Sequence, residues 1–361
     1  MAWDFEARPL LVFWETTRAC GLACKHCRAS AIAEPLPGEL THEEGLAFID
    51  HLASFGRPSP ILILTGGDVL RRGRLWELID RANERGVPFA LSPSVTPLLT
   101  EEMMRRFKDV GTHSISLSLD SATAEGHDGL RGVPGTFDRT MELIAYANEI
   151  DLKIQINTTV MASNVRELPL IFEQIQRAGA DVWEVFFLIS EGRGSQMVPA
   201  SPPDVEAVCE FLVASANYGV TVRTVEAPFF RRVALEQPEE PRGLAADLIA
   251  DLRARLGPAT HRPRNRSANT RDGKGIVFIN YKGEVTPSGF LPTVAGNLRE
   301  QSLRDIYCDS DIFRRLRQAD AFQGRCGICP HRDLCGGSRA RAYFASGDPL
   351  GEDPACVFQP D

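Results

Sequence analysis

Short apolar runs alternate with longer amphipathic segments along the first two-thirds of the chain. The runs expected to form strands are residues 10–14, 61–65, 87–91, 114–119, 152–160 and 182–189. The segments expected to form helices are residues 41–55, 74–85, 100–108, 135–150, 164–177 and 202–218. This repeated order predicts an α/β fold with a parallel, barrel-like sheet. The pattern alone does not distinguish a closed eight-unit barrel from a partial six-unit barrel.

The strand–helix rhythm breaks at about residue 226, which predicts three parts of the chain. Residues 1–225 are expected to form the barrel, and residues 226–274 a bridging segment or lid. Residues 275–361 are expected to form a small second domain that contains a hairpin around Tyr281–Gly283 and a cysteine-rich tail.

Charge and composition exclude several classes of protein. The net charge of −8 gives no support for nucleic-acid binding, although residues 253–274 are rich in arginine. No apolar run approaches the roughly 20 residues that span a bilayer, and Met1–Glu6 lacks the features of a signal peptide. We therefore expect a cytoplasmic protein without membrane segments. Seven of its nine cysteines cluster in two places, which favours metal binding over disulfides.

The first cysteine group follows the first predicted strand and comprises Cys20, Cys24 and Cys27. Thiolates are soft ligands that hold iron–sulfur clusters well. Three thiolates on a four-iron cluster would leave one iron open to a small molecule. The alternatives are a zinc site or three cysteines packed as small apolar residues. We interpret His26 as a neighbour of the cluster and not as a ligand.

The second group comprises Cys326, Cys329 and Cys335, followed at a distance by Cys356. Four thiolates would fully ligate one [4Fe–4S] cluster, and a structural zinc site is the alternative. His331 is a weaker candidate ligand, and Cys308 lies outside the pattern and is left unassigned.

The spacing C-x3-C-x2-C resembles the signature of the radical SAM superfamily. That resemblance implies a partial (β/α)6 barrel and a [4Fe–4S] cluster whose open iron binds S-adenosylmethionine. It also implies reductive cleavage of that cofactor to a 5′-deoxyadenosyl radical, which abstracts a substrate hydrogen. The reductant would be a flavodoxin or a ferredoxin.

The same resemblance implies roles for residues at the ends of the predicted strands. Gly66, Gly67 and Asp68 match the GGE motif that binds the methionine amino group, with aspartate in place of glutamate. Ser118 is expected to contact the ribose or the carboxylate of the cofactor, and Arg131 is expected to pair with the methionine carboxylate. Asn157 and Leu188 are expected to contact the ribose and the adenine respectively.

The C-terminal cysteines resemble the SPASM domain of radical SAM maturases. Family members with two auxiliary clusters carry further cysteines where this chain has Ser288 and either Ser338 or Arg339. The resemblance therefore implies one auxiliary [4Fe–4S] cluster in this chain.

The detailed motifs Cys24–Ala29, Thr65–Asp68 and Cys335–Arg341 resemble the branch that contains haem b synthase and haem d1 enzymes. This implies an oxidoreductase that acts on tetrapyrrole propionates, with oxidative decarboxylation as the expected reaction. Residues 262–274 could bind such carboxylates. Modification of a peptide by a maturase is the alternative, and a non-catalytic iron–sulfur or zinc protein is a third. The sequence identifies neither the substrate nor the oligomeric state.

Overall fold

The computed structural model describes residues 3–236, 240–265 and 269–360. The chain divides into two compact units. The first unit comprises Met1–Ala23, Arg28–Ser116 and Thr270–Phe322. The second comprises Cys24–Cys27, Leu117–Asn269 and Gln323–Asp361.

Parallel strands form the centre of the first unit. Strand β1 (Leu11–Glu15) pairs in parallel with β2 (Ile61–Thr65) on one side and with β9 (Gly275–Ile279) on the other. Strand β2 pairs in parallel with β3 (Phe89–Leu91), and β3 with the start of β4 (Ile115–Ser118). The short strands β10 (Glu284–Thr286) and β11 (Gly296–Asn297) continue from β9 in antiparallel pairs, and β8 (Arg271–Asp272) pairs with β9.

The helices of the first unit cover this sheet. They are α1 (His42–Ala53), α2 (Leu75–Arg85), α3 (Glu101–Asp109), α10 (Leu303–Asp309) and α11 (Asp311–Arg317). Trp14 on β1 is fully buried and meets Phe48 of α1 edge to face, with 5.3 Å between ring centroids. Such aromatic pairs add stabilisation beyond the area that they bury.

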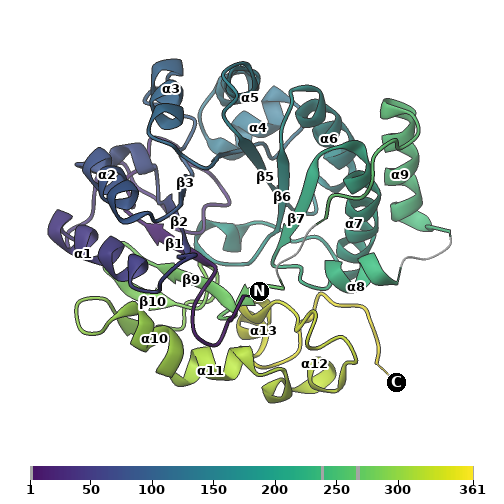
Figure 1. Ribbon diagram of the computed structural model, residues 1–361. Coiled ribbons are helices and arrows are strands. Elements are labelled where there is room, and N and C mark those ends of the chain that lie inside the picture. The colour runs from purple at the N-terminus through teal and green to yellow at the C-terminus, as the bar shows by residue number, and fades with distance from the viewer. Residues whose placement is uncertain (1–2, 237–239, 266–268, 361) are drawn as a thin grey trace. The chain divides into compact units, whose positions relative to one another are not determined.

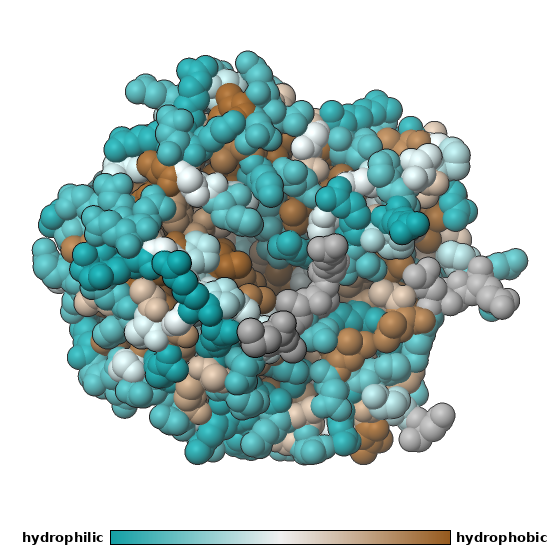
Figure 2. All heavy atoms as spheres, in the orientation of Figure 1, coloured by the Kyte–Doolittle hydropathy of each residue, from teal (hydrophilic) through white to brown (hydrophobic). Residues whose placement is uncertain are grey.

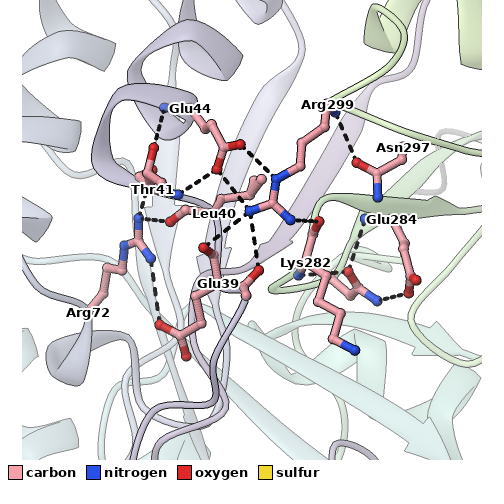
Figure 3. Close-up of polar contacts among 11 residues, drawn as sticks. Glu39, Leu40, Thr41, Glu44, Arg72, Lys282, Glu284, Asn297 and Arg299 are labelled. Atoms are coloured by element: carbon pink, nitrogen blue, oxygen red, sulfur yellow. Dashed lines mark hydrogen bonds and ion pairs between the residues drawn. The ribbon is translucent and has the colours of Figure 1, made fainter.

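Helix α1 begins where the sequence places a capping box. The Thr41 hydroxyl accepts the Glu44 amide N–H, and the Glu44 carboxylate accepts the Thr41 amide N–H. Arg299 donates to both oxygens of that carboxylate, at 2.7 and 3.0 Å, and to the Lys282 carbonyl in the β9–β10 turn. Figure 3 shows this guanidinium between the start of α1 and the hairpin, which it joins.

The second unit is built on three parallel strands, β5 (Ile154–Val160), β6 (Val182–Phe187) and β7 (Thr221–Val225). Its helices are α4 (Ala124–Arg131), α5 (Thr136–Glu149), α6 (Leu168–Arg177), α7 (Pro202–Ser215), α8 (Phe230–Leu235), α9 (Gly243–Leu256), α12 (Gly324–Ile328) and α13 (Arg339–Ser346). Figure 1 shows α5, α6 and α7 along the outside of these strands. Trp183 of β6 is fully buried against Phe172 of α6 and Phe211 of α7.

The expected α/β fold with a mostly parallel sheet is confirmed, and most element bounds differ from the prediction by one or two residues. Strand β7 and helices α4, α8, α12 and α13 were not predicted, because each is short. Within the segment proposed as a bridge or lid, α9 packs beside α6, and Arg255 of α9 lies 3.1 Å from Glu173 of α6.

Hydrophilic residues dominate the exposed helical surface on the face drawn in Figure 2, with apolar residues scattered among them. Among the described residues, no helix is both long enough and apolar enough to cross a membrane.

Candidate functional site

In the first unit, the segment that leads to Cys20 lies directly against Gly66–Asp68. The Gly67 amide donates to the Thr17 carbonyl at 2.8 Å, and the Asp68 amide donates to the Ala19 carbonyl at 2.7 Å. A Cβ atom on Gly67 would lie 2.4 Å from the Ala19 oxygen, so a larger residue could not fit there. Packing of the backbone therefore requires this glycine whether or not a ligand binds nearby.

The Asp68 carboxylate is occupied by the protein itself. It is fully buried and accepts hydrogen bonds from the Thr96 hydroxyl at 2.8 Å and from the amides of Leu70 and Ser94 at 3.1 and 3.3 Å. Burial raises the pKa of Asp68, while these hydrogen bonds oppose the rise. The side chain thus fixes the loop after β2.

The Cys20 thiol is buried and lies among hydrogen-bonding groups. The Leu22 amide donates to its sulfur at 3.3 Å, and the Ser94 hydroxyl lies 3.5 Å away. The same hydroxyl donates to the Gly67 carbonyl at 2.8 Å. N–H donors to a thiolate are typical of iron–sulfur ligands, so this environment fits a cluster ligand. Ser94 was missed by sequence reasoning, although its position just after buried β3 was a usable signal.

In the second unit, three backbone contacts hold the Cys24–Cys27 turn. The Lys25 amide donates to the Leu130 carbonyl at 2.8 Å. Arg193 donates through Nε to the Cys24 carbonyl at 2.7 Å, and its own amide donates to the Cys27 carbonyl at 3.0 Å. Arg193 was also missed, because nothing in its local sequence indicates this distant contact.

A buried charge cluster lies beside Cys24. Arg131, at the end of α4, pairs with the Asp120 carboxylate and places Nη1 3.6 Å from the Cys24 sulfur. His26 Nε2 lies 3.2 Å from the same carboxylate, which also accepts the Thr159 amide at 2.7 Å. Burial would raise the pKa of Asp120, but Arg131 and His26 outweigh it and hold that pKa well below its usual range.

This cluster includes two of the predicted residues. His26 is engaged by Asp120, in agreement with a neighbouring role and not with ligation. Arg131 is already paired, yet its buried Nε has no hydrogen-bond partner among the described residues. A buried donor of this kind favours an acceptor supplied by a ligand.

The other predicted cofactor contacts lie on or directly after strands β4, β5 and β6 in the second unit. Ser118 is half-buried at the end of β4, and Leu188 is buried directly after β6. Asn157 lies in β5, where its side-chain carbonyl accepts the Gln155 amide at 2.8 Å.

The second cysteine group lines one cavity within the second unit. The cavity has an empty volume of about 430 Å³ that opens to solvent, and all four predicted ligands border it, namely Cys326, Cys329, Cys335 and Cys356. Among the described residues, no three His, Cys, Asp or Glu side chains are close enough to hold a single metal ion. The donor set therefore fits a larger cluster better than one zinc ion.

Buried polar groups shape this cavity. Arg339 is completely buried, donates to the Cys326 sulfur at 3.5 Å, and is anchored by the Gly351 carbonyl at 2.7 Å. The Gly337 amide donates to the Cys335 sulfur at 3.3 Å. Asp353 accepts the Ser338 amide at 2.8 Å and thereby fixes the turn before Cys356. These contacts resemble the outer shell that orients metal ligands.

The remaining candidates have other partners. His331 lies 2.7 Å from the Glu236 carboxylate, and Cys308 donates to the Ala7 carbonyl at 3.5 Å. Ser288 is buried, and its hydroxyl accepts the Phe290 amide.

Two arginines of the arginine-rich segment have backbone partners within their own units. Arg271 is buried and donates to the carbonyl groups of Leu316 and Arg317. Arg264 donates to the Gly219 carbonyl. Arg266 lies outside the described residues.

Comparison with known proteins places this geometry in context. Residues 14–175 match the radical SAM superfamily model, and residues 271–330 match the SPASM iron–sulfur cluster-binding domain. The chain is 36% identical over 353 residues to an AdoMet-dependent heme synthase of Methanosarcina barkeri, covering 98% of this chain and 97% of that protein. It is 30% identical over 374 residues to an Fe-coproporphyrin III synthase of the same organism, covering 98% and 88%.

A maturase and a solved structure are also similar to this chain. A mycofactocin maturase of Mycobacterium tuberculosis is 29% identical over 358 residues, covering 97% of this chain and 83% of that protein. Streptococcus suis SuiB, solved with S-adenosylmethionine, shares the fold with a TM-score of 0.72 at 16% identity, covering 98% of this chain and 78% of that chain.

Proposed function

Because this chain belongs to the radical SAM superfamily and carries its SPASM domain, we propose that it oxidises a propionate side chain of a tetrapyrrole in haem synthesis. One observation carries the choice of substrate. The similarity to the heme synthase extends over 98% of this chain and 97% of that protein. A flavodoxin or a ferredoxin is the proposed reductant.

We assign the cluster ligands from the motifs and their surroundings. Cys20, Cys24 and Cys27 would hold the [4Fe–4S] cluster that binds S-adenosylmethionine, and the N–H donor to the Cys20 sulfur supports this. The four cysteines that line the cavity of the second unit would hold one auxiliary [4Fe–4S] cluster. When bound, the first cluster and S-adenosylmethionine supply a 5′-deoxyadenosyl radical that removes a hydrogen atom from the substrate.

The chain's own residues would bind and orient the cofactor. The backbone at Gly66 and Gly67 would accept the methionine ammonium group, while Asp68 fixes that loop. The buried Nε of Arg131, which has no partner among the described residues, would donate to the methionine carboxylate. Ser118, at the end of β4, would contact the ribose or the same carboxylate. Asn157 and Leu188 would contact the ribose and the adenine.

Loss of a hydrogen atom and carbon dioxide from a propionate leaves a vinyl group and one electron. The electron needs an acceptor, and the auxiliary site is the proposed place for it. Arg339 and Gly337 donate to two of its sulfurs, and donors of this kind favour the reduced state of a cluster.

The test uses protein reconstituted without oxygen and supplied with dithionite, S-adenosylmethionine and Fe-coproporphyrin III. We expect 5′-deoxyadenosine together with a porphyrin product that has lost carbon dioxide, both measured by mass spectrometry. Cys24→Ala is expected to abolish both products. Formation of 5′-deoxyadenosine beside an unchanged porphyrin would contradict the proposed substrate and favour peptide modification.

A further inference from the structure

A row of polar residues crosses the three strands of the second unit. The register aligns Asn157 of β5 with Glu184 of β6, and Glu184 with Arg223 of β7. Residues in register on neighbouring strands project from the same face of a sheet. Trp183 projects from the opposite face and packs against α6 and α7. The polar row therefore lies on the face that these helices leave uncovered.

Hydrogen bonds join the first two members of the row. Gln155 donates through Nε2 to the Asn157 side-chain carbonyl and to the Glu184 carboxylate, both at 2.8 Å. Glu184 is half-buried. Its burial raises the pKa of its carboxyl, although Arg223 and Gln155 favour the charged form.

Arg223 differs from the other arginines near this sheet. It is exposed, and among the described residues no hydrogen bond to its guanidinium is found. In contrast, the side chain of Arg264, beside β7, donates a hydrogen bond to the Gly219 carbonyl. The backbone carbonyl of Arg264 accepts the Val222 amide. Arg223 thus presents a guanidinium from the uncovered face of the sheet.

We propose that Arg223 binds a carboxylate side chain of the substrate, with Gln155 holding Glu184 beside it. A guanidinium matches a carboxylate with two parallel N–H donors, which gives both charge and orientation. Through Gln155 the same row reaches Asn157, the residue assigned to the ribose of the cofactor. This inference rests on the proposed tetrapyrrole substrate, whose propionates are the ligands that Arg223 would take.

The test measures binding of Fe-coproporphyrin III to the reconstituted protein by titrating its Soret absorbance. Arg223→Gln is expected to weaken binding at least about ten-fold, since a charged hydrogen bond contributes roughly 1.5–3 kcal/mol. Glu184→Gln is expected to bind at least as tightly as wild type, because it removes a negative charge beside the bound carboxylate. The tetramethyl ester of the porphyrin is expected to bind wild type and Arg223→Gln equally.

Arg253→Gln is the matched control, because Arg253 is an exposed arginine of α9 on the same unit. Iron content and melting temperature check that each variant is folded. Equal affinity of wild type and Arg223→Gln for Fe-coproporphyrin III would overturn the carboxylate site and leave the proposed substrate standing. Failure of wild type to bind the porphyrin at all would overturn both.

Discussion

Arg131 donates to the sulfur of Cys24 at 3.6 Å while its other terminal nitrogen pairs with Asp120. The Asp120 side chain is 1% exposed and that of Arg131 is 13% exposed, so this pair is almost entirely removed from water. Removing one partner of a buried ion pair leaves an uncompensated charge. The pair therefore couples the stability of the second unit to the environment of a predicted cluster ligand.

Arg131→Met is expected to lower the free energy of unfolding by about 3 kcal/mol, because Asp120 would remain buried without its cation. Urea unfolding of the cluster-free protein, followed by circular dichroism, measures this change. The matched experiment is the double variant with Asp120→Asn, which is expected to lose less than the two single variants added together. Simple additivity would show that the two side chains do not interact.

His127 predicts a loss of stability in acid. Its ring Nδ1 accepts the Asp120 amide at 3.2 Å, so the folded protein holds the neutral ring. Burial first, and then Arg131, lower the pKa of His127 to about 4 from 6.5. Because the unfolded chain takes up the proton first, this contribution is complete above pH 6.5 and is lost as the pH falls toward 4, by about 3 kcal/mol.

The measurement compares unfolding free energies at pH 7 and pH 5 for wild type and His127→Asn. The asparagine can offer its side-chain carbonyl to the Asp120 amide but does not titrate in this range. Its stability is expected to change less between the two pH values. An identical pH dependence in both proteins would rule out His127 as the titrating group.

Iron content tests the number of clusters. Wild type is expected to hold about eight irons per chain, from two [4Fe–4S] centres, and Cys335→Ala about four. Cys308→Ala is the matched control and is expected to keep about eight, because the Cys308 thiol donates to the Ala7 carbonyl. A wild-type value near twelve would reveal an additional cluster. Chemical iron analysis with electron paramagnetic resonance provides the count.

Arg299→Ala is expected to destabilise the first unit by about 1 kcal/mol, because it removes a bidentate contact to Glu44 that is still partly exposed. Thermal unfolding of this variant is compared with that of Arg74→Ala. Arg74 is 54% exposed and pairs with Glu77, so its loss is expected to cost less. Equal losses would show that joining the hairpin to α1 adds nothing measurable.

Local patterns predicted much of the fold. The apolar run at residues 10–14 predicted β1, and the spacing of Thr41 and Glu44 predicted the start of α1. The motif glycines were also recognisable, and the structure gives Gly67 a physical reason in the close approach of Ala19. Each of these features depends on residues close together in the sequence, or on glycine, which is recognisable because it has no side chain.

The contacts that define the site environment were not predictable in this way. Arg193 reaches the Cys24 carbonyl from a distant part of the chain, and Arg339, the first residue of α13, reaches the Cys326 sulfur across 13 residues. Hydrogen bonds from Thr96 and from the amides of Leu70 and Ser94 hold the Asp68 carboxylate, and local sequence indicated none of them. Each of these depends on long-range packing, which periodicity does not encode.

The position of β1 between β2 and β9 has a consequence for synthesis of the protein. Leu11 pairs with Ile61 on one side and with Ile276 on the other. The ribosome synthesises the chain from the N-terminus. The residues of β9 must therefore be translated before β1 can form hydrogen bonds along its second edge. Until then one edge of a largely buried strand stays open to other chains. Nascent chains that end before β9 are therefore expected to depend on chaperones, and expressed fragments without β9 to aggregate.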